Sequence, residues 1–415
     1  MPCRSENYKE ARVMDNREKQ IVIKEALGEF LHVMMWRRSL HQFPELSFEE
    51  HRTSRFISDT LAHDGIECRP VAGTGVLARI EGTAEGTPRR AVVLRADMDA
   101  LPVTENTGLG FSSKNKGVMH ACGHDMHAAM LLGALRILRR HRDKFSGTVF
   151  GLFQPGEELN PGGAFSVLKE EPFEGYDITA FVGQHVEPLL KTGMFGFRKG
   201  KYMASNDELR FHVRGVGGHA ALRDRIKDPV QASAALLQEL YAIPAANPDP
   251  QAPTIVSVGK VVAAGATNVV PDEVYMEGTM RTFDEDWRAR VKQAVRDAGA
   301  KTDGLFGVRT EVNISDGYPC VTNDPELTRK VAEATAALFG EEAVTELGLR
   351  PTSDDFGYYS ERYPSVYYRI GVGGDGEFFE QHSAGRVHTS TFRPDEKALG
   401  YGVVQFVNIV FTLLG

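Results

Sequence analysis

The sequence predicts an α/β protein of two domains, in which a mostly parallel central sheet is interrupted by an inserted α+β domain. The chain has 415 residues, which is more than one hydrophobic core usually supports. Apolar runs typical of strands buried on both faces alternate with helical patterns towards both ends of the chain. Between about residues 205 and 314, apolar and polar side chains instead alternate along the strand patterns, as in a sheet with one exposed face.

The composition is that of an ordinary globular protein. Apolar residues make up 42% and charged residues 25%, and the net charge of −8 without a dense basic stripe argues against nucleic-acid binding. No apolar run approaches the ~18 residues needed to cross a bilayer, and residues 1–19 lack the apolar core of a signal peptide. The four cysteines are widely scattered, which favours reduced thiols. We therefore expect a cytoplasmic protein with neither nucleic-acid nor membrane partners.

The elements of the larger predicted domain follow from the period of its apolar residues. Helical spacing predicts helices at 20–39, 48–63, 325–339 and 395–414, with a further apolar helix after residue 127. Strand patterns, several of them continuously apolar, occur at 73–80, 90–95, 147–153, 178–183 and 365–370. Alternation of these strands and helices predicts the mostly parallel sheet.

The middle of the chain has the element order of a small α+β domain. Strands are expected at 209–213, 254–262, 274–281 and 310–314, and helices at 228–242 and 285–298. This order, strand–helix–strand–strand–helix–strand, fits a ferredoxin-like fold with an antiparallel sheet. We therefore expect one domain at 1–204 with 315–415, and the inserted domain at 205–314. The glycine pair before His219 lacks the G-x-G-x-x-G pattern, which excludes a dinucleotide loop.

Side chains that bind metals gather at the ends of the predicted strands. They are Asp97 and Asp99 after the strand at 90–95, Glu157 and Glu158 after 147–153, and His185 after 178–183. Cys122 and His124 add a thiol and an imidazole just before an apolar helix, and Asp125 is expected to be either the N-cap of this helix or a group that supports a ligand. Open α/β sheets place their sites beyond the carboxyl ends of the strands. Adjacent carboxylates at such an end repel one another unless a cation or a proton lies between them.

The chemistry of this set indicates a hydrolytic metal centre. The candidate ligands are Cys122, His124, one of Glu157 and Glu158, His185 and His388, with His382 as an alternative to the last. Thiolate, imidazole and carboxylate together suit Zn²⁺, Mn²⁺, Co²⁺ or Ni²⁺. These ligands exceed the need of one catalytic ion, so a pair of ions about 3.5–4 Å apart uses them better. The glutamate that is not a ligand could take a proton from an activated water and pass it to a leaving nitrogen.

Several motifs in register resemble the amidohydrolase branch of the aminoacylase/carboxypeptidase G metallopeptidases. That branch includes hippurate hydrolase and the plant auxin–amino-acid conjugate hydrolases. The motifs lie at residues 94–102, 122–125, 154–158, 185–186 and 217–221, and the match runs in order from about residue 38 to the C-terminus. The resemblance implies a zinc-peptidase-like catalytic domain and a lid domain through which the protein forms a homodimer.

The resemblance also implies a role for each site residue. Two divalent ions per subunit, Mn²⁺ or Zn²⁺ with Co²⁺ or Ni²⁺ as alternatives, would be held by Cys122, His124, Glu158, His185 and His388. Glu157 would be the general base and acid, and Asp99 would orient a ligand. His219 in the lid would stabilise the oxyanion, from the partner subunit. Asn268 and Arg281 match lid positions that hold a substrate carboxylate.

The activity implied is hydrolysis of the amide bond of an N-acyl or N-aroyl amino acid, a small-molecule substrate with a carboxylate. A dipeptidase, or a hydrolase that removes nitrogen from an unusual aromatic or heterocyclic amine, would use the same metal centre. A non-catalytic ligand binder is a third hypothesis, against which the adjacent glutamates and the full ligand set argue.

Two stretches depart from the family pattern, residues 222–227 and residues 389–391, and both border the expected substrate pocket.

Overall fold

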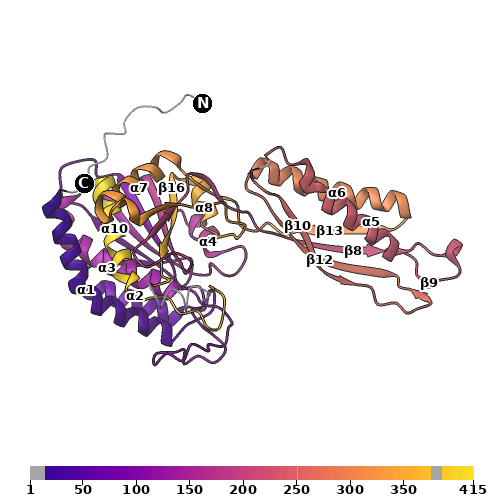
Figure 1. Ribbon diagram of the computed structural model, residues 1–415, viewed down its shortest axis with the longest axis horizontal. Helices are drawn as coiled ribbons and strands as arrows, with labels where there is room; N and C mark the ends of the chain where they lie inside the picture. The colour runs from indigo at the N-terminus through magenta and orange to yellow at the C-terminus, as the bar shows by residue number, and fades with distance from the viewer. Residues whose placement is uncertain (1–14, 250, 375–385) are drawn as a thin grey trace. The chain divides into compact units, whose positions relative to one another are not determined.

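The computed structural model describes residues 15–249, 251–374 and 386–415. The chain divides into two compact units (Figure 1). Unit 1 comprises Met1–Gly200, Asn323–Gly348 and Tyr359–Gly415, and unit 2 comprises Lys201–Thr322 and Leu349–Tyr358. The domain boundaries expected from the sequence, 204/205 and 314/315, remain a proposal. Among the described residues, no helix combines the length and apolar character required to cross a membrane.

Unit 1 is built on an eight-stranded sheet, which confirms the predicted α/β class. Its strands, in spatial order, are β1 (Glu67–Val71), β2 (Gly75–Glu81), β4 (Thr148–Gln154), β3 (Arg90–Asp97), β5 (Asp177–Glu187), β16 (Ser365–Gly371), β6 (Phe195–Phe197) and β15 (Val344–Glu346). The four central strands, β4, β3, β5 and β16, run parallel. Strands β1 and β2 are antiparallel additions at one side, and β6 runs antiparallel to β16 and parallel to β15. The central strands therefore share one carboxyl edge, where a site is expected.

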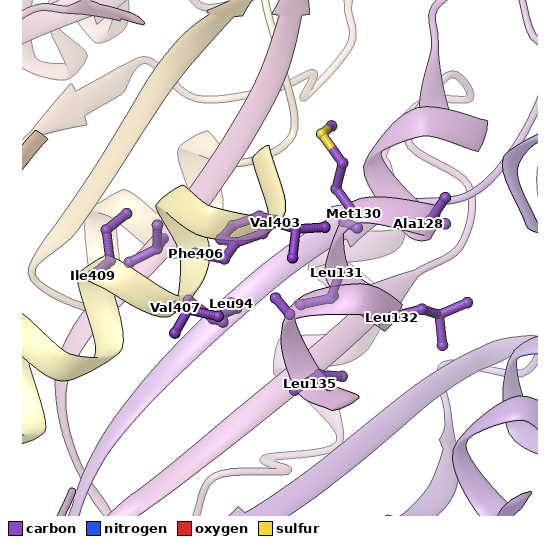
Figure 2. Close-up of a cluster of buried hydrophobic side chains, with 14 of the residues drawn as sticks. Leu94, Ala128, Met130, Leu131, Leu132, Leu135, Val403, Phe406, Val407 and Ile409 are labelled. Carbon is purple, nitrogen blue, oxygen red and sulfur yellow. The ribbon is translucent and has the colours of Figure 1, made fainter. Parts of the chain in front are cut away.

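Helices cover this sheet. They are α1 (Asn16–Gln42), α2 (His51–His63), α3 (His124–Arg140), α4 (Gly163–Lys169), α7 (Pro325–Phe339), α8 (Gly357–Arg362) and α10 (Ala398–Leu414). Helices α1, α3 and α10 pack on one another, and α3 and α10 also pack on β3. Figure 2 shows this core, in which Leu131 of α3 and Val407 of α10 lie beside Leu94 of β3. Both helices are apolar on nearly all sides because the core encloses them.

The start of α3 has no side-chain cap. The side chains of Asp15 and Asp324 cap α1 and α7 by accepting backbone N–H groups. At α3 the capping position is Gly123, with φ of 88° and no side-chain cap, so the prediction that Asp125 is the N-cap was wrong. Asp125 lies within the first turn, and its carboxylate instead contacts two buried side chains of α1. A side chain at Gly123 would also clash with Val186, 2.6 Å from its Cβ position.

Unit 2 has the predicted element order. It contains β8 (Asp207–Arg214), α5 (Pro229–Ala242), β10 (Ile255–Val262), β12 (Glu273–Arg281), α6 (Glu285–Phe306) and β13 (Arg309–Ile314). The sheet order β10–β12–β8–β13 with antiparallel pairing throughout confirms the ferredoxin-like arrangement. Side chains of β8 alternate between the core under α5 and α6 and the solvent.

Short elements complete the described chain. A two-stranded ribbon pairs β9 (Gly218–His219) with β11 (Val269–Val270), and another pairs β7 (Gly200–Met203) with β14 (Val321–Asn323). Single 3₁₀ turns occur at η1 (Arg142–Lys144), η2 (Arg223–Arg225), η3 (Ile243–Ala246) and η4 (Glu341–Ala343). These elements are shorter than the periodic segments from which the sequence predicts structure.

Candidate metal centre

The predicted ligands of unit 1 come together at the carboxyl edge of the parallel strands. Glu157 and Glu158 follow β4, and His185 lies near the end of β5. Cys122 and His124 stand at the start of α3. His388 comes from a segment near the C-terminus, where its backbone N–H donates to the Ala121 carbonyl at 2.7 Å. That hydrogen bond joins two parts of the chain that are far apart in sequence.

The ligand atoms form overlapping groups around Cys122. The atoms of Cys122, His124 and His185 lie within 4.8 Å of one another, and so do those of Cys122, Glu158 and His388. The Cys122 Sγ is 3.4 Å from His185 Nε2, and His388 Nε2 is 3.2 Å from Glu158 Oε1. Cys122 belongs to both groups, and the five side chains together offer more donor atoms than one catalytic ion requires. The geometry therefore fits a pair of metal ions better than a single one.

Hydrogen bonds fix the orientation of two of the histidine rings. His124 Nδ1 lies 3.1 Å from Asp99 Oδ1, and His185 Nδ1 donates to the Val186 carbonyl at 2.8 Å. In each neutral ring the proton is thus on Nδ1, which leaves the Nε2 lone pair free for a metal. His124 Nε2 is buried and, within the described residues, has no hydrogen-bond partner. A buried polar atom without a partner is costly, and a bound cation would satisfy it.

The charges around the site also call for a cation. Burial alone would lower the pKa of His124, but the neighbouring Asp97 and Asp99 carboxylates raise that pKa to about 10. Burial, together with the charges of Glu158 and Glu157, raises the pKa of the Cys122 thiol well above its usual value. Without a cation, Cys122 and His124 therefore retain protons, and both groups have to lose a proton to bind a metal.

Asp99 joins the first strand end to the glutamate pair. Its Oδ2 accepts the Ser47 hydroxyl at 2.7 Å and the backbone N–H of Glu158 at 2.9 Å, while its Oδ1 holds the His124 ring. Glu157 Oε2 and Glu158 Oε1 both lie 3.9 Å from His124 Nε2. The adjacent carboxylates thus reach the same ring. Ser47, which holds Asp99, lies 52 residues earlier in the chain, and no local pattern in the sequence indicates its role.

Comparison with known proteins agrees with this geometry. Residues 93–401 match the model of the peptidase family M20/M25/M40. The chain belongs to this family. The resemblance inferred from the sequence motifs is thereby confirmed.

Relatives with known names match most of this M20-family chain. The N-acetyl-L-cysteine deacetylase of Bacillus subtilis (strain 168) is 38% identical over 364 residues, which cover 88% of this chain and 83% of the relative. The N-acyl-L-amino acid amidohydrolase of Geobacillus stearothermophilus is 40% identical over 298 residues, 69% of this chain and 79% of the relative. The crystal structure of a dinuclear metal-binding M20 peptidase from Bacillus subtilis matches with a TM-score of 0.79 and 32% identity, covering 93% and 99% of the two chains.

Two buried polar groups lie beside the predicted ligands: Asp97, which the strand-end pattern indicates, and His127, which flanks the ligands in the sequence. His127 Nδ1 lies 2.5 Å from Asp97 Oδ1, and its Nε2 accepts the backbone N–H of Val186 at 3.0 Å. Arg95 pairs with the other oxygen of Asp97. His127 follows His124 by three residues on α3, a spacing that places both rings on one face of the helix and agrees with the expectation that His127 lies beside the ligands.

The predicted site residues of unit 2 fall in two places within that unit. His219 on β9 pairs with Val269 on β11, and Ala220 N–H donates to the Asn268 carbonyl at 2.9 Å, so exposed His219 and Asn268 are neighbours. Arg281 ends β12, and its Nη1 donates to the Pro351 carbonyl at 3.2 Å. Their roles stay predictions. His382, the alternative ligand, lies outside the described residues.

Proposed function

We propose that this M20-family protein is a metal-dependent amidohydrolase that cleaves the amide bond of N-acyl or N-aroyl amino acids. The observation that carries the proposal is the convergence of two overlapping ligand groups on Cys122, beside the buried carboxylate of Glu157. The names of the Bacillus subtilis and Geobacillus stearothermophilus relatives support the choice of an N-acyl amino acid as substrate. The carboxylate of that substrate would bind in unit 2 at Asn268 and Arg281, because a guanidinium pairs well with a carboxylate.

The metal centre would hold two divalent ions per subunit. Mn²⁺ or Zn²⁺ are proposed, with Co²⁺ or Ni²⁺ as alternatives, because thiolate, imidazole and carboxylate ligands suit all four. Cys122, His124, His185, Glu158 and His388 would hold these ions. When bound, such ions polarise the scissile carbonyl and lower the pKa of a nearby water.

We propose different roles for the two glutamates: Glu158 holds a metal ion and Glu157 transfers a proton. Glu158 groups with Cys122 and His388, whereas Glu157 is in neither of the two groups that contain Cys122. Glu157 lies instead with His124 and Glu158. As the family resemblance implies, we assign to Glu157 the transfer of a proton from the attacking water to the leaving nitrogen. Asp99 keeps the His124 ring and the Glu158 backbone in position for that chemistry.

We further propose that the protein is a homodimer through unit 2. Apolar side chains around the β9–β11 ribbon and on β10 are exposed: Val216, Val261, Val262 and Val269 are between 45% and 51% accessible. Exposed apolar side chains gathered in one region are typical of protein–protein contacts. Val269 pairs with His219, so a partner bound there would lie beside the histidine proposed to stabilise the oxyanion in the partner's site.

The cytoplasmic location expected from the sequence also remains a proposal.

Exchange of Glu157 for glutamine tests the proposed reaction. Glu157→Gln should lower kcat on N-acetyl- or N-benzoyl-amino acids about 10²–10⁴-fold, because general acid–base catalysis is worth that much. Metal content, measured by elemental analysis of the same sample, should stay near the wild-type value. Glu158→Gln is the matched control and should lose metal as well as activity. Retained turnover with lost metal in Glu157→Gln would reverse the two assignments.

A peptidase acting on dipeptides is the second candidate, since the family and its dinuclear neighbour both bear the name peptidase. A substrate panel of N-acetyl-amino acids, N-benzoyl-amino acids and dipeptides, assayed on one metal-loaded sample, separates the two. Activity on none of them would favour an unusual aromatic or heterocyclic amine as substrate. Ligand binding without metal, together with no hydrolysis under any metal, would instead support a non-catalytic binder.

A further inference from the structure

Strand β5 carries the ligand His185 beyond the point where β3 pairs with it. The parallel pairing of β3 and β5 ends with Arg95 opposite Gly183, but β5 continues to Glu187. In this extension β5 pairs, among the described residues, with β16 up to Gly371. Backbone N–H and C=O groups in a buried strand need hydrogen-bond partners. On the side of the extension that faces β3, these partners have to come from groups other than the β3 backbone.

The imidazole of His127 provides one such hydrogen-bond partner. The backbone N–H of Val186 donates to His127 Nε2 at 3.0 Å, so this nitrogen is unprotonated and the proton of the ring is on Nδ1. Nδ1 in turn donates to Asp97 Oδ1 at 2.5 Å. Asp97 is the last residue of β3, so the pair of side chains continues the connection between the two strands where the backbone pairing has ended.

The anchor of this connection is itself rigid. Arg95 Nη1 donates to Asp97 Oδ2 at 2.5 Å, and Arg95 Nε donates to Gln154 Oε1 at 3.0 Å. The hydroxyl of Tyr359 donates to the same oxygen of Gln154, also at 3.0 Å. All of these side chains are buried, and buried networks in which the groups are paired resist rearrangement.

Val186 connects the His127–Asp97 pair to the predicted ligand His185. Its carbonyl accepts His185 Nδ1–H at 2.8 Å while its N–H is held by His127, so one residue is fixed from both sides. The centroids of the His127 and His185 rings are 4.7 Å apart. We propose that His127, held by Asp97, is a positioning residue that orients the His185 ring and directs its Nε2 to the metal. This inference rests on the metal centre of the proposed function and not on the identity of the substrate.

Two substitutions separate this role from simple packing. His127→Leu fills a similar volume but offers Val186 no acceptor, whereas His127→Gln keeps an amide oxygen for Val186 and an N–H for Asp97. The full-length, metal-free protein is titrated with Co²⁺, and the Cys122 thiolate–Co²⁺ charge-transfer band and the d–d bands are recorded. His127→Leu should bind Co²⁺ about 10–100-fold more weakly with altered d–d bands, while His127→Gln should stay within about 3-fold of the wild type.

Wild-type Co²⁺ affinity and spectrum in His127→Leu would overturn the proposal. So would an equal loss in both variants with native circular dichroism, because that result would assign the effect to the shape of the ring. If His127→Leu fails to fold, ¹⁵N NMR of the imidazoles in the metal-free wild type tests the proposal instead. The His127 ring should be protonated at Nδ1 and unprotonated at Nε2. The opposite tautomer would refute the proposed contact with Val186. Absence of Co²⁺ binding by the wild type would refute the metal centre as a whole, which differs from a loss confined to the variants.

Discussion

Cys122 and His124 retain protons in the metal-free protein that a bound cation has to displace. Burial raises the pKa of the Cys122 thiol well above its usual value, and the adjacent carboxylates bring the pKa of His124 to about 10. His185 differs, because burial and the charge of Arg369 hold its pKa well below the usual value, so its ring is already neutral. The three predicted ligands thus start from different protonation states.

Metal binding should therefore release protons and strengthen as the pH rises. At pH 7 both raised pKa values lie above the pH, so about one proton each should leave Cys122 and His124 when a metal binds, and none should leave His185. Calorimetric titration with Zn²⁺ in two buffers of different ionisation enthalpy measures this number directly. Cys122→Ser, as the control, should release about one proton fewer. Zn²⁺ affinity that does not change between pH 6 and pH 8 would contradict this prediction.

The first turn of α3 is the element on which the site depends. Its residues His124, Asp125 and His127 are each held by a different part of unit 1. His124 is bound by Asp99, and His127 is bound by Asp97 at the end of β3. Asp125 Oδ2 lies 2.7 Å from Arg37 Nε and 2.8 Å from His41 Nδ1, both on α1. The helix start that carries the ligands is thereby fixed in place by β3, by the segment after it and by α1.

Loss of the Arg37–Asp125 contact should destabilise the protein strongly. Both side chains are buried, so Arg37→Met leaves the Asp125 carboxylate with an incomplete set of partners and should cost about 3–5 kcal/mol in the free energy of unfolding. Arg38→Met is a matched control: both arginines pair with Glu396, but Arg38 is 40% exposed, so its loss should cost only about 0–1 kcal/mol. Urea unfolding of both variants measures the difference. Equal losses would show that burial of the Arg37 pair does not matter.

The sequence predicts the elements that bear the site better than it predicts their ends. The apolar runs of β3 and β4 place Asp97, Asp99 and the glutamate pair at strand ends because buried parallel strands are continuously apolar. The same criterion ends β5 at residue 183, four residues early, because Gln184, His185 and Glu187 are polar and only tertiary partners keep them extended. Asp125 looks like a cap for the same reason: its partners on α1 are distant in sequence and leave no local pattern.

At the scale of the whole molecule, the roles predicted from the family are distributed over both units. The metal ligands belong to unit 1, whereas His219, Asn268 and Arg281 belong to unit 2. Val269, which pairs with His219, is exposed, and a second copy of the chain is the partner that we propose for this part of unit 2. In a twofold dimer each contact occurs twice, so both sites would receive the same residue from the other chain.

The proposal that His219 acts in the partner's site makes a quantitative prediction for mixed dimers. Neither His219→Ala nor Glu157→Gln homodimers should hydrolyse the substrate at an appreciable rate, because every site lacks one of the two groups. In a heterodimer of the two variants, the chain with intact Glu157 would receive an intact His219 from its partner, while the other site would have both defects. Heterodimers isolated with two different affinity tags should therefore show about half of the wild-type activity per dimer.

Disruption of the dimer provides the control for this experiment. Val269→Asp, which places a charge beside His219 in the proposed contact, should shift the protein towards monomer in analytical ultracentrifugation and lower kcat while metal content is retained. Introduced into both chains, it should also prevent formation of the active heterodimer. Inactive heterodimers with a full complement of metal would show that His219 does not act across the dimer. A monomeric wild type with full activity would exclude the dimer itself, because no second chain would then be available to supply His219.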